Sequence, residues 1–130
     1  MRRQDGERGA VAVELAFVLP LLLLILIGSI EYGRVFFIQN SLTHAAREGA
    51  RNGAVHWNDP PPRLDVEGAA LRGTVLEDLP VVVESDVDDC APGDNITVTT
   101  TVTLESMSGF LGPGLFPIDL QGQAVMRCGG

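Results

Sequence analysis

The sequence predicts an α+β protein, in which a long N-terminal transmembrane-to-exported helix is followed by a short second helix and a small three-stranded antiparallel sheet packed on the long helix. Two observations support this prediction. An apolar run over residues 10–30 continues into residues 31–55, where apolar and small side chains recur at helical spacing, and residues 81–128 contain stretches in which apolar and polar side chains alternate. Helical and strand periodicity in separate parts of a chain is typical of α+β proteins.

The long helix begins with an apolar run over residues 10–30. At about 1.5 Å per residue the run is roughly 30 Å long, which matches the hydrocarbon thickness of a bilayer. Pro20 either only bends the helix or contributes to packing between subunits, and membrane helices tolerate such a proline. No small-x-small cleavage site follows the run, so we expect it to be kept as an anchor rather than removed as a signal peptide.

The flanking charges predict the orientation of this anchor. Three arginines precede the apolar run, and the rest of the chain is long and acidic. Because basic residues stay on the cytoplasmic side, we expect a single-pass cell-membrane protein. Residues 1–9 would then be cytoplasmic, residues 10–30 transmembrane, and residues 31–130 an extracytoplasmic domain.

The helix is expected to continue beyond the membrane as an amphipathic helix over residues 31–55, because no proline separates this stretch from the anchor. A stripe of alanine and glycine on one face would let another backbone approach closely. The partner is either the protein's own sheet or a neighbouring subunit. The residues at three- and four-residue steps are Val35, Ile38, Leu42, Ala45, Ala46, Gly49, Ala50 and Gly53.

A second helix is predicted over residues 65–79, after a proline-rich loop. Asp65 is a suitable N-cap, because its carboxylate can accept a hydrogen bond from an unpaired amide of the first turn. Gly68 and Gly73 weaken the prediction, since glycine lowers helix propensity.

Three strands are predicted over residues 81–84, 96–104 and 118–126, within a sheet region that spans residues 81–128. In the middle strand, apolar side chains and threonines alternate, with Thr100 as the one polar residue in the apolar row. This alternation indicates an antiparallel sheet that is buried on one face. The inward side chains are expected to be Ile96, Val98, Val102, Leu104, Ile118, Leu120, Ala124 and Met126.

The two cysteines, Cys90 and Cys128, both lie in the predicted extracytoplasmic part. A pair in an oxidising compartment more often forms a disulfide than two free thiols. A bridge closing a loop of roughly 40 residues would contribute about 3–4 kcal/mol in the loop-entropy model. Free thiols and an intermolecular bond are the alternatives, and neither His44 nor His56 has zinc-ligand spacing with a cysteine.

Charge and motifs argue against several functions. The net charge is −8 and all basic residues are arginine. An acidic surface does not suit nucleic acid, and the sequence has no Ser/His/Asp grouping, phosphate loop or HExxH motif. We therefore expect no enzyme, cofactor or small-molecule substrate. The acidic loop of Asp86, Asp88, Asp89 and Asp94 is a conceivable calcium site, but it lacks the DxDxDG order and is interpreted as a solvated turn, so no metal is assigned.

Three motifs together make residues 8–55 similar to the TadE family, which are pseudopilins of the Flp or Tad (tight adherence) pilus system. They are Gly9 with Glu14 as the fifth residue after it, the EYGR sequence at residues 31–34 and the AAREGAR sequence at residues 45–51. The resemblance implies cleavage by a prepilin peptidase between Gly9 and Ala10. It also implies a minor or accessory role in pilus assembly, with other pilins and assembly components as partners.

Glu14 is unusual because a carboxylate in an apolar membrane segment is energetically costly and needs a partner. Cleavage would leave an ammonium group at Ala10, and in pilin-like polymers such a carboxylate can meet the terminal amine of a neighbouring subunit. Alternatively, Glu14 only reaches the membrane interface. Two alternatives to the TadE interpretation are an unprocessed, signal-anchored binding or scaffold domain of the cell envelope, and a pseudopilin of a type II-like secretion machine.

Overall fold

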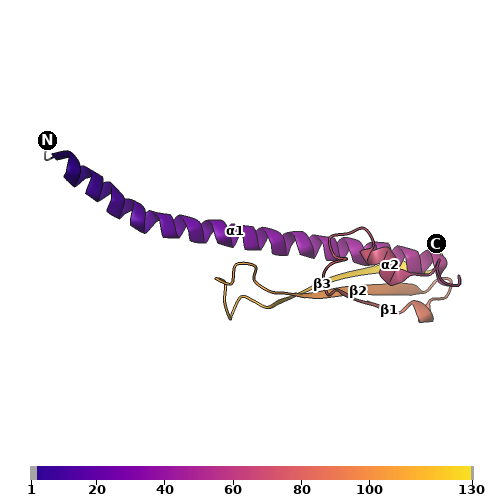
Figure 1. Ribbon diagram of the computed structural model, residues 1–130. Coiled ribbons are helices and arrows are strands. Elements are labelled where there is room, and N and C mark those ends of the chain that lie inside the picture. Colours follow the sequence, from indigo (N-terminus) through magenta and orange to yellow (C-terminus); the bar gives the residue numbers. More distant parts are fainter. Residues whose placement is uncertain (1–2, 130) are drawn as a thin grey trace.

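The computed structural model describes residues 3–129 and has the predicted α+β architecture. A 54-residue helix, α1 (Arg3–His56), is followed by a short helix, α2 (Val66–Leu71). The remaining elements are β1 (Val82–Ser85), the 3₁₀ turn η1 (Val87–Asp89), β2 (Asn95–Leu104) and β3 (Ile118–Arg127). The N-terminal half of α1 projects away from the rest of the chain, and its C-terminal half lies along the sheet (Figure 1).

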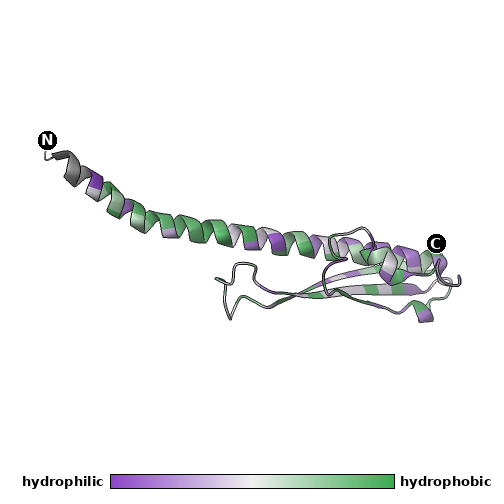
Figure 2. Cartoon of the chain, in the orientation of Figure 1, coloured by the Kyte–Doolittle hydropathy of each residue, from purple (hydrophilic) through white to green (hydrophobic). Residues whose placement is uncertain are grey.

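The helix α1 is continuous through Pro20, Gly28 and Gly33. It curves within the N-terminal half, and it already begins at Arg3, before the apolar run. Hydropathy divides it into two parts: apolar residues dominate the projecting half, and polar residues become frequent where the helix meets the sheet (Figure 2). The predicted single helix is therefore confirmed, and in the structure it also includes most of residues 1–9.

The sheet has the strand order β1-β2-β3, and both pairings are antiparallel. Each strand lies within one residue of its predicted bounds. Burial alternates along β2 as predicted, with Ile96, Val98, Val102 and Leu104 almost completely buried. The apolar face of the sheet packs on α1, so the period-two pattern identified the correct face.

The sheet and α1 approach each other closely at Gly122 of β3. A Cβ atom at this position would lie 2.6 Å from the carbonyl oxygen of Leu42 in α1, so only glycine fits there. Thr100, the register partner of Gly122, is fully buried, and its Oγ1 donates toward the Leu42 carbonyl at 2.9 Å and lies 3.3 Å from the Gly122 carbonyl oxygen. The one polar residue in the apolar row thus joins the strand to the helix.

The second helix is shorter than predicted, because α2 ends at Leu71 rather than at residue 79. Arg72 leaves the helix with φ −59° and ψ 126°, and Gly73 takes a φ of +72°, in the left-handed region that favours glycine. The following residues form turns that bury Leu76 completely in the core. The apolar pattern over residues 72–79 therefore correctly indicated a buried side chain, but the segment forms turns rather than the predicted helix.

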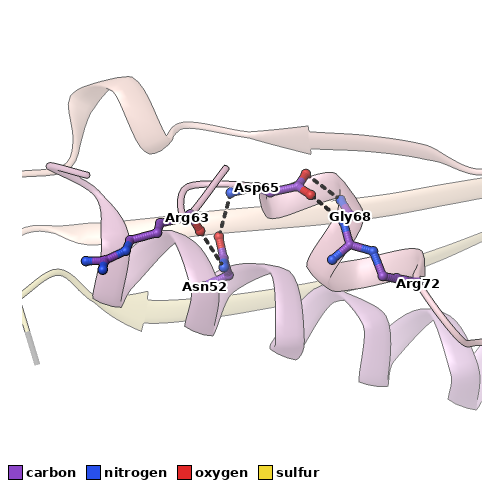
Figure 3. Close-up of polar contacts among 5 residues, drawn as sticks. All are labelled: Asn52, Arg63, Asp65, Gly68 and Arg72. Atoms are coloured by element: carbon purple, nitrogen blue, oxygen red, sulfur yellow. Dashed lines mark hydrogen bonds and ion pairs between the residues drawn. The ribbon is translucent and has the colours of Figure 1, made fainter. Parts of the chain in front are cut away.

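Polar contacts hold α2 against α1 (Figure 3). Asp65 caps α2 as predicted, with its Oδ1 accepting a 2.9 Å hydrogen bond from the Gly68 amide. Its Oδ2 pairs with Arg72 at 2.7 Å. From α1, the side-chain amide of Asn52 donates to the Arg63 carbonyl at 3.0 Å and accepts from the Asp65 amide at 2.9 Å. The Asn52 side chain therefore supplies the hydrogen-bond partners of these two backbone groups in the segment that leads into α2.

The alanine and glycine stripe of α1 packs against this chain's own elements. Ala45, Ala46 and Ala50 are at most 2% exposed. A Cβ at Gly53 would collide with the Ile96 side chain, and a Cβ at Gly49 would lie 3.1 Å from the Val66 carbonyl oxygen. Of the two partners that the sequence allowed, the protein's own sheet and second helix occupy the stripe.

Candidate functional site

The first part of the candidate site is the projecting half of α1. All residues from 8 to 26 are exposed, including Phe17 at 79% and Leu24 at 66%. Within the described residues, α1 is the one helix that is long and apolar enough to cross a membrane. Such a surface is unfavourable in water, because removing each of these apolar side chains from water would lower the free energy. The helix is thus a candidate membrane span.

The predicted processing and assembly residues lie at the start of this span. Gly9, Ala10 and Glu14 are all helical and exposed. A Cβ at Gly9 would meet no other atom within 4 Å. Ala10 and Glu14 are four residues apart, so their side chains lie on one face of the helix. The structure thus places the three residues on one accessible stretch of helix.

A second part of the candidate site lies where the apolar half of α1 ends, at Glu31. Glu31 is 3% exposed, which is rare for a carboxylate. Its Oε1 accepts a 2.8 Å hydrogen bond from the Ser108 backbone amide and a 3.0 Å bond from the Ser106 hydroxyl. The Ser108 amide is the main reason why the pKa of Glu31 is lowered, against the opposing effect of desolvation. We call this arrangement the Glu31 clasp.

Two further contacts fasten the same region. The Arg34 guanidinium donates to the Glu105 carbonyl at 2.8 Å, and the Gln39 side chain donates to the Gln121 carbonyl at 2.7 Å. Together with the clasp, these contacts attach the start of the β2–β3 loop, residues 105–117, and the strand that follows it to α1. The loop therefore lies alongside the helix at the end of its apolar half.

Sequence reasoning noticed Glu31 and Arg34 only as part of a family-like motif and assigned them no role. A signal was available, because Glu31 is the first charged residue after the apolar run and must find hydrogen-bond partners if it is buried. The hydrogen-bond partners of Glu31 could not be predicted from the sequence, because Ser108 lies 77 residues further along the chain.

At the far end of the molecule, Cys90 and Cys128 form the predicted disulfide, with their Cα atoms 5.9 Å apart. The Cys128 amide donates to the Asp94 carbonyl at 2.8 Å, and the Gly129 amide donates to the Ala54 carbonyl at 3.0 Å. The bridge therefore holds the end of β3 against both the η1–β2 turn and the end of α1.

One carboxylate of the acidic loop makes a structural contact. Asp86 Oδ1 accepts a 2.6 Å hydrogen bond from the Thr97 amide, which fixes the turn before β2. Among the residues that the structure describes, no group of three or more His, Cys, Asp or Glu side chains is arranged to hold a metal ion.

Comparison with known proteins gives one family. Residues 9–51, about a third of the chain, match the family model described as TadE-like protein. No curated protein and no solved structure matches the chain. The matched segment begins at Gly9, covers the projecting half of α1 and the Glu31 clasp residue, and ends within the alanine and glycine stripe. Residues 9–51 are therefore TadE-like, in agreement with the resemblance seen in the sequence.

Proposed function

We propose that this protein is a TadE-like pseudopilin, a membrane-anchored accessory or minor subunit for assembly of a Flp/Tad-type pilus, matured by a prepilin peptidase between Gly9 and Ala10. The TadE-like match and the candidate membrane helix support a membrane protein associated with the Tad pilus. The observation that carries the finer proposal is the exposed apolar half of α1, which starts with Gly9 and contains Glu14 as its one carboxylate.

The shape of the molecule supports this function. A rod of exposed apolar helix can be held by lipid before assembly and by the helices of neighbouring subunits after it, because both surroundings remove the same side chains from water. In the C-terminal half of α1, by contrast, one face is already covered by its own sheet and α2. Contacts between subunits in the filament would therefore be made by the projecting half.

Glu14 has a specific role in the proposal. Within hydrocarbon its carboxylate needs a charge partner, and the new ammonium group at Ala10 of an adjacent subunit supplies one. The two groups neutralise each other only when the subunits are in register along the helix axis. Glu14 would thereby favour one stagger between neighbouring chains. The ion pair would then set the register of the subunits as well as hold them together.

Complementation of a deletion strain tests the assembly role. We expect the wild-type gene to restore surface pili and Glu14→Ala to fail to do so, while the variant chain remains in the membrane and is still cleaved. Glu48→Ala, which removes another exposed carboxylate of α1 outside the apolar half, is the matched control and should assemble normally. Normal piliation and unchanged crosslinking to partner subunits with Glu14→Ala would remove the assembly role from this residue.

A further inference from the structure

The β2–β3 loop has an unusual composition for an exposed loop. Residues 106–118 contain no charged residue. Three of their large apolar side chains are strongly exposed, with Met107 at 66%, Phe110 at 82% and Leu115 at 65%. Exposed loops of water-soluble proteins are usually polar, so a cluster of this kind indicates a surface that is covered in the functional state.

The position of this loop identifies what covers it. Met107 and Ser108 line a small cavity together with Ile27, Ile30 and Glu31, which belong to the end of the apolar half of α1. Ile27 lies one helical turn before Glu31, toward the membrane, so Met107 and Ser108 lie beside the last turn of the apolar half. The loop extends beyond the strands along α1 in this direction (Figure 1).

We propose that the β2–β3 loop inserts into the interfacial layer of the bilayer that α1 spans, with Phe110 and Leu115 among the lipid-contacting side chains. The inference rests on the membrane span of the proposed function. Lipid is the expected occupant for three reasons: the loop borders the last turns of the candidate span, it carries no charged residue over residues 106–118, and its attachment to Glu31 fixes its depth relative to that span.

The Glu31 clasp makes this arrangement physically consistent. A carboxylate at the edge of the hydrocarbon layer loses hydration, and the Ser106 hydroxyl and Ser108 amide replace water as donors to its Oε1, while the buried Oε2 has no hydrogen-bond partner among the described residues. The same contacts prevent the loop from swinging away from α1. The protein would then meet the membrane surface at two points, the helix and the loop, which limits tilting of the sheet relative to the bilayer.

Lipid-quenching fluorescence on the full-length chain tests the inference. In a Trp57→Phe background, which removes the one native tryptophan, a single tryptophan is placed by Phe110→Trp or, in a second reporter, by Leu115→Trp. The proteins are reconstituted into phosphatidylcholine–phosphatidylglycerol nanodiscs without quencher, with lipid carrying a doxyl quencher near the headgroup, or with lipid carrying it near the middle of the acyl chain. Val125→Trp, at an exposed position of β3, and Phe17→Trp, within the candidate span, are the controls.

We expect quenching of both loop reporters by about twofold or more, with little quenching of Val125→Trp, because nitroxide quenching requires near contact with the lipid. Unquenched loop reporters beside a quenched Phe17→Trp would overturn the inference and leave the anchor intact. The loop reporters are also exposed to a quencher dissolved in water. If they are shielded from this aqueous quencher but are not reached by the lipid quencher, the inference is overturned in favour of a protein partner. Absence of quenching at Phe17→Trp as well would overturn both this inference and the membrane span on which it rests.

Discussion

The backbone amide of Ser108 donates a 2.8 Å hydrogen bond to the carboxylate of Glu31, across 77 residues of sequence. This contact joins the end of the apolar half of α1 to the β2–β3 loop, and it lowers the pKa of a carboxylate that is 3% exposed. It also marks the division of the molecule into a projecting helix and a region folded on its own core.

The first prediction concerns Glu31 itself. Glu31→Gln removes the charge that strengthens the clasp, so hydrogen exchange of residues 105–117 should become faster at neutral pH in detergent or nanodiscs. Glu48→Gln, at an exposed position of the same helix, should leave this exchange unchanged. Equal protection of the loop in wild type and Glu31→Gln would show that the carboxylate does not hold it.

The clasp also predicts a pH dependence. The Ser108 amide lowers the pKa of Glu31 in the folded state. Its contribution to stability is therefore complete at neutral pH, above the pKa in the unfolded chain, and is lost as the pH falls through the lowered pKa of the folded state. Thermal unfolding at neutral and acidic pH should show a larger loss of Tm for wild type than for Glu31→Gln. Parallel losses in the two proteins would contradict the assignment.

The second site for a test is the contact between Gly122 and α1. Gly122→Ala would place a methyl group against the backbone of Leu42 and Thr43, which a packed helix cannot accommodate without separating from β3. We expect a loss of about 1–3 kcal/mol in the free energy of unfolding, the usual cost of overpacking. Gly112→Ala, where the added Cβ meets nothing within 4 Å, should change it by less than about 0.5 kcal/mol. Urea unfolding measures both.

Thr100 gives a finer test of the same contact. Thr100→Val preserves the side-chain shape and removes the buried hydroxyl that donates to the Leu42 carbonyl. The expected cost is about 1 kcal/mol, the net contribution of a typical hydrogen bond. Thr101→Val, on the opposite face of β2, should be neutral or slightly stabilising, because valine suits a strand. Equal unfolding midpoints for Thr100→Val and wild type would mean that only the side-chain volume matters.

How far the sequence predicted the molecule can be judged from these residues. Periodicity located the long helix and all three strands, because both arise from local rules that hydrophobic side chains follow. It identified Thr100 as the polar break in an apolar row, but the reason for it, a helix carbonyl 58 residues earlier in the chain, depends on tertiary packing.

The errors have physical causes as well. The apolar residues beyond Leu71 suggested more helix, whereas Gly73 in the left-handed region ends it and turns bury Leu76 instead. The role of Glu31 was missed because its partners lie in a loop whose path no local pattern specifies. Gly9, Ala10 and Glu14 depend on other proteins for their roles, so these assignments stay predictions.

The disulfide should contribute strongly to so small a core. Replacing Cys90 and Cys128 by alanine opens a loop with a sequence separation of 38 residues. The loop-entropy model predicts a loss of about 3–4 kcal/mol in the free energy of unfolding. Urea unfolding of wild type with and without a reductant should reproduce this loss, whereas the double variant should not respond to the reductant. A wild-type unfolding curve that is unaffected by reduction would contradict this account of the bridge.

The most direct test of the central claim is the intact mass of the membrane-extracted chain, expressed with and without its prepilin peptidase and measured under non-reducing conditions. The account predicts loss of residues 1–9 only when the peptidase is present, with Ala10 as the new N-terminus. A chain that stays uncut beside an active peptidase would contradict the pseudopilin assignment and leave an unprocessed envelope anchor as the better description.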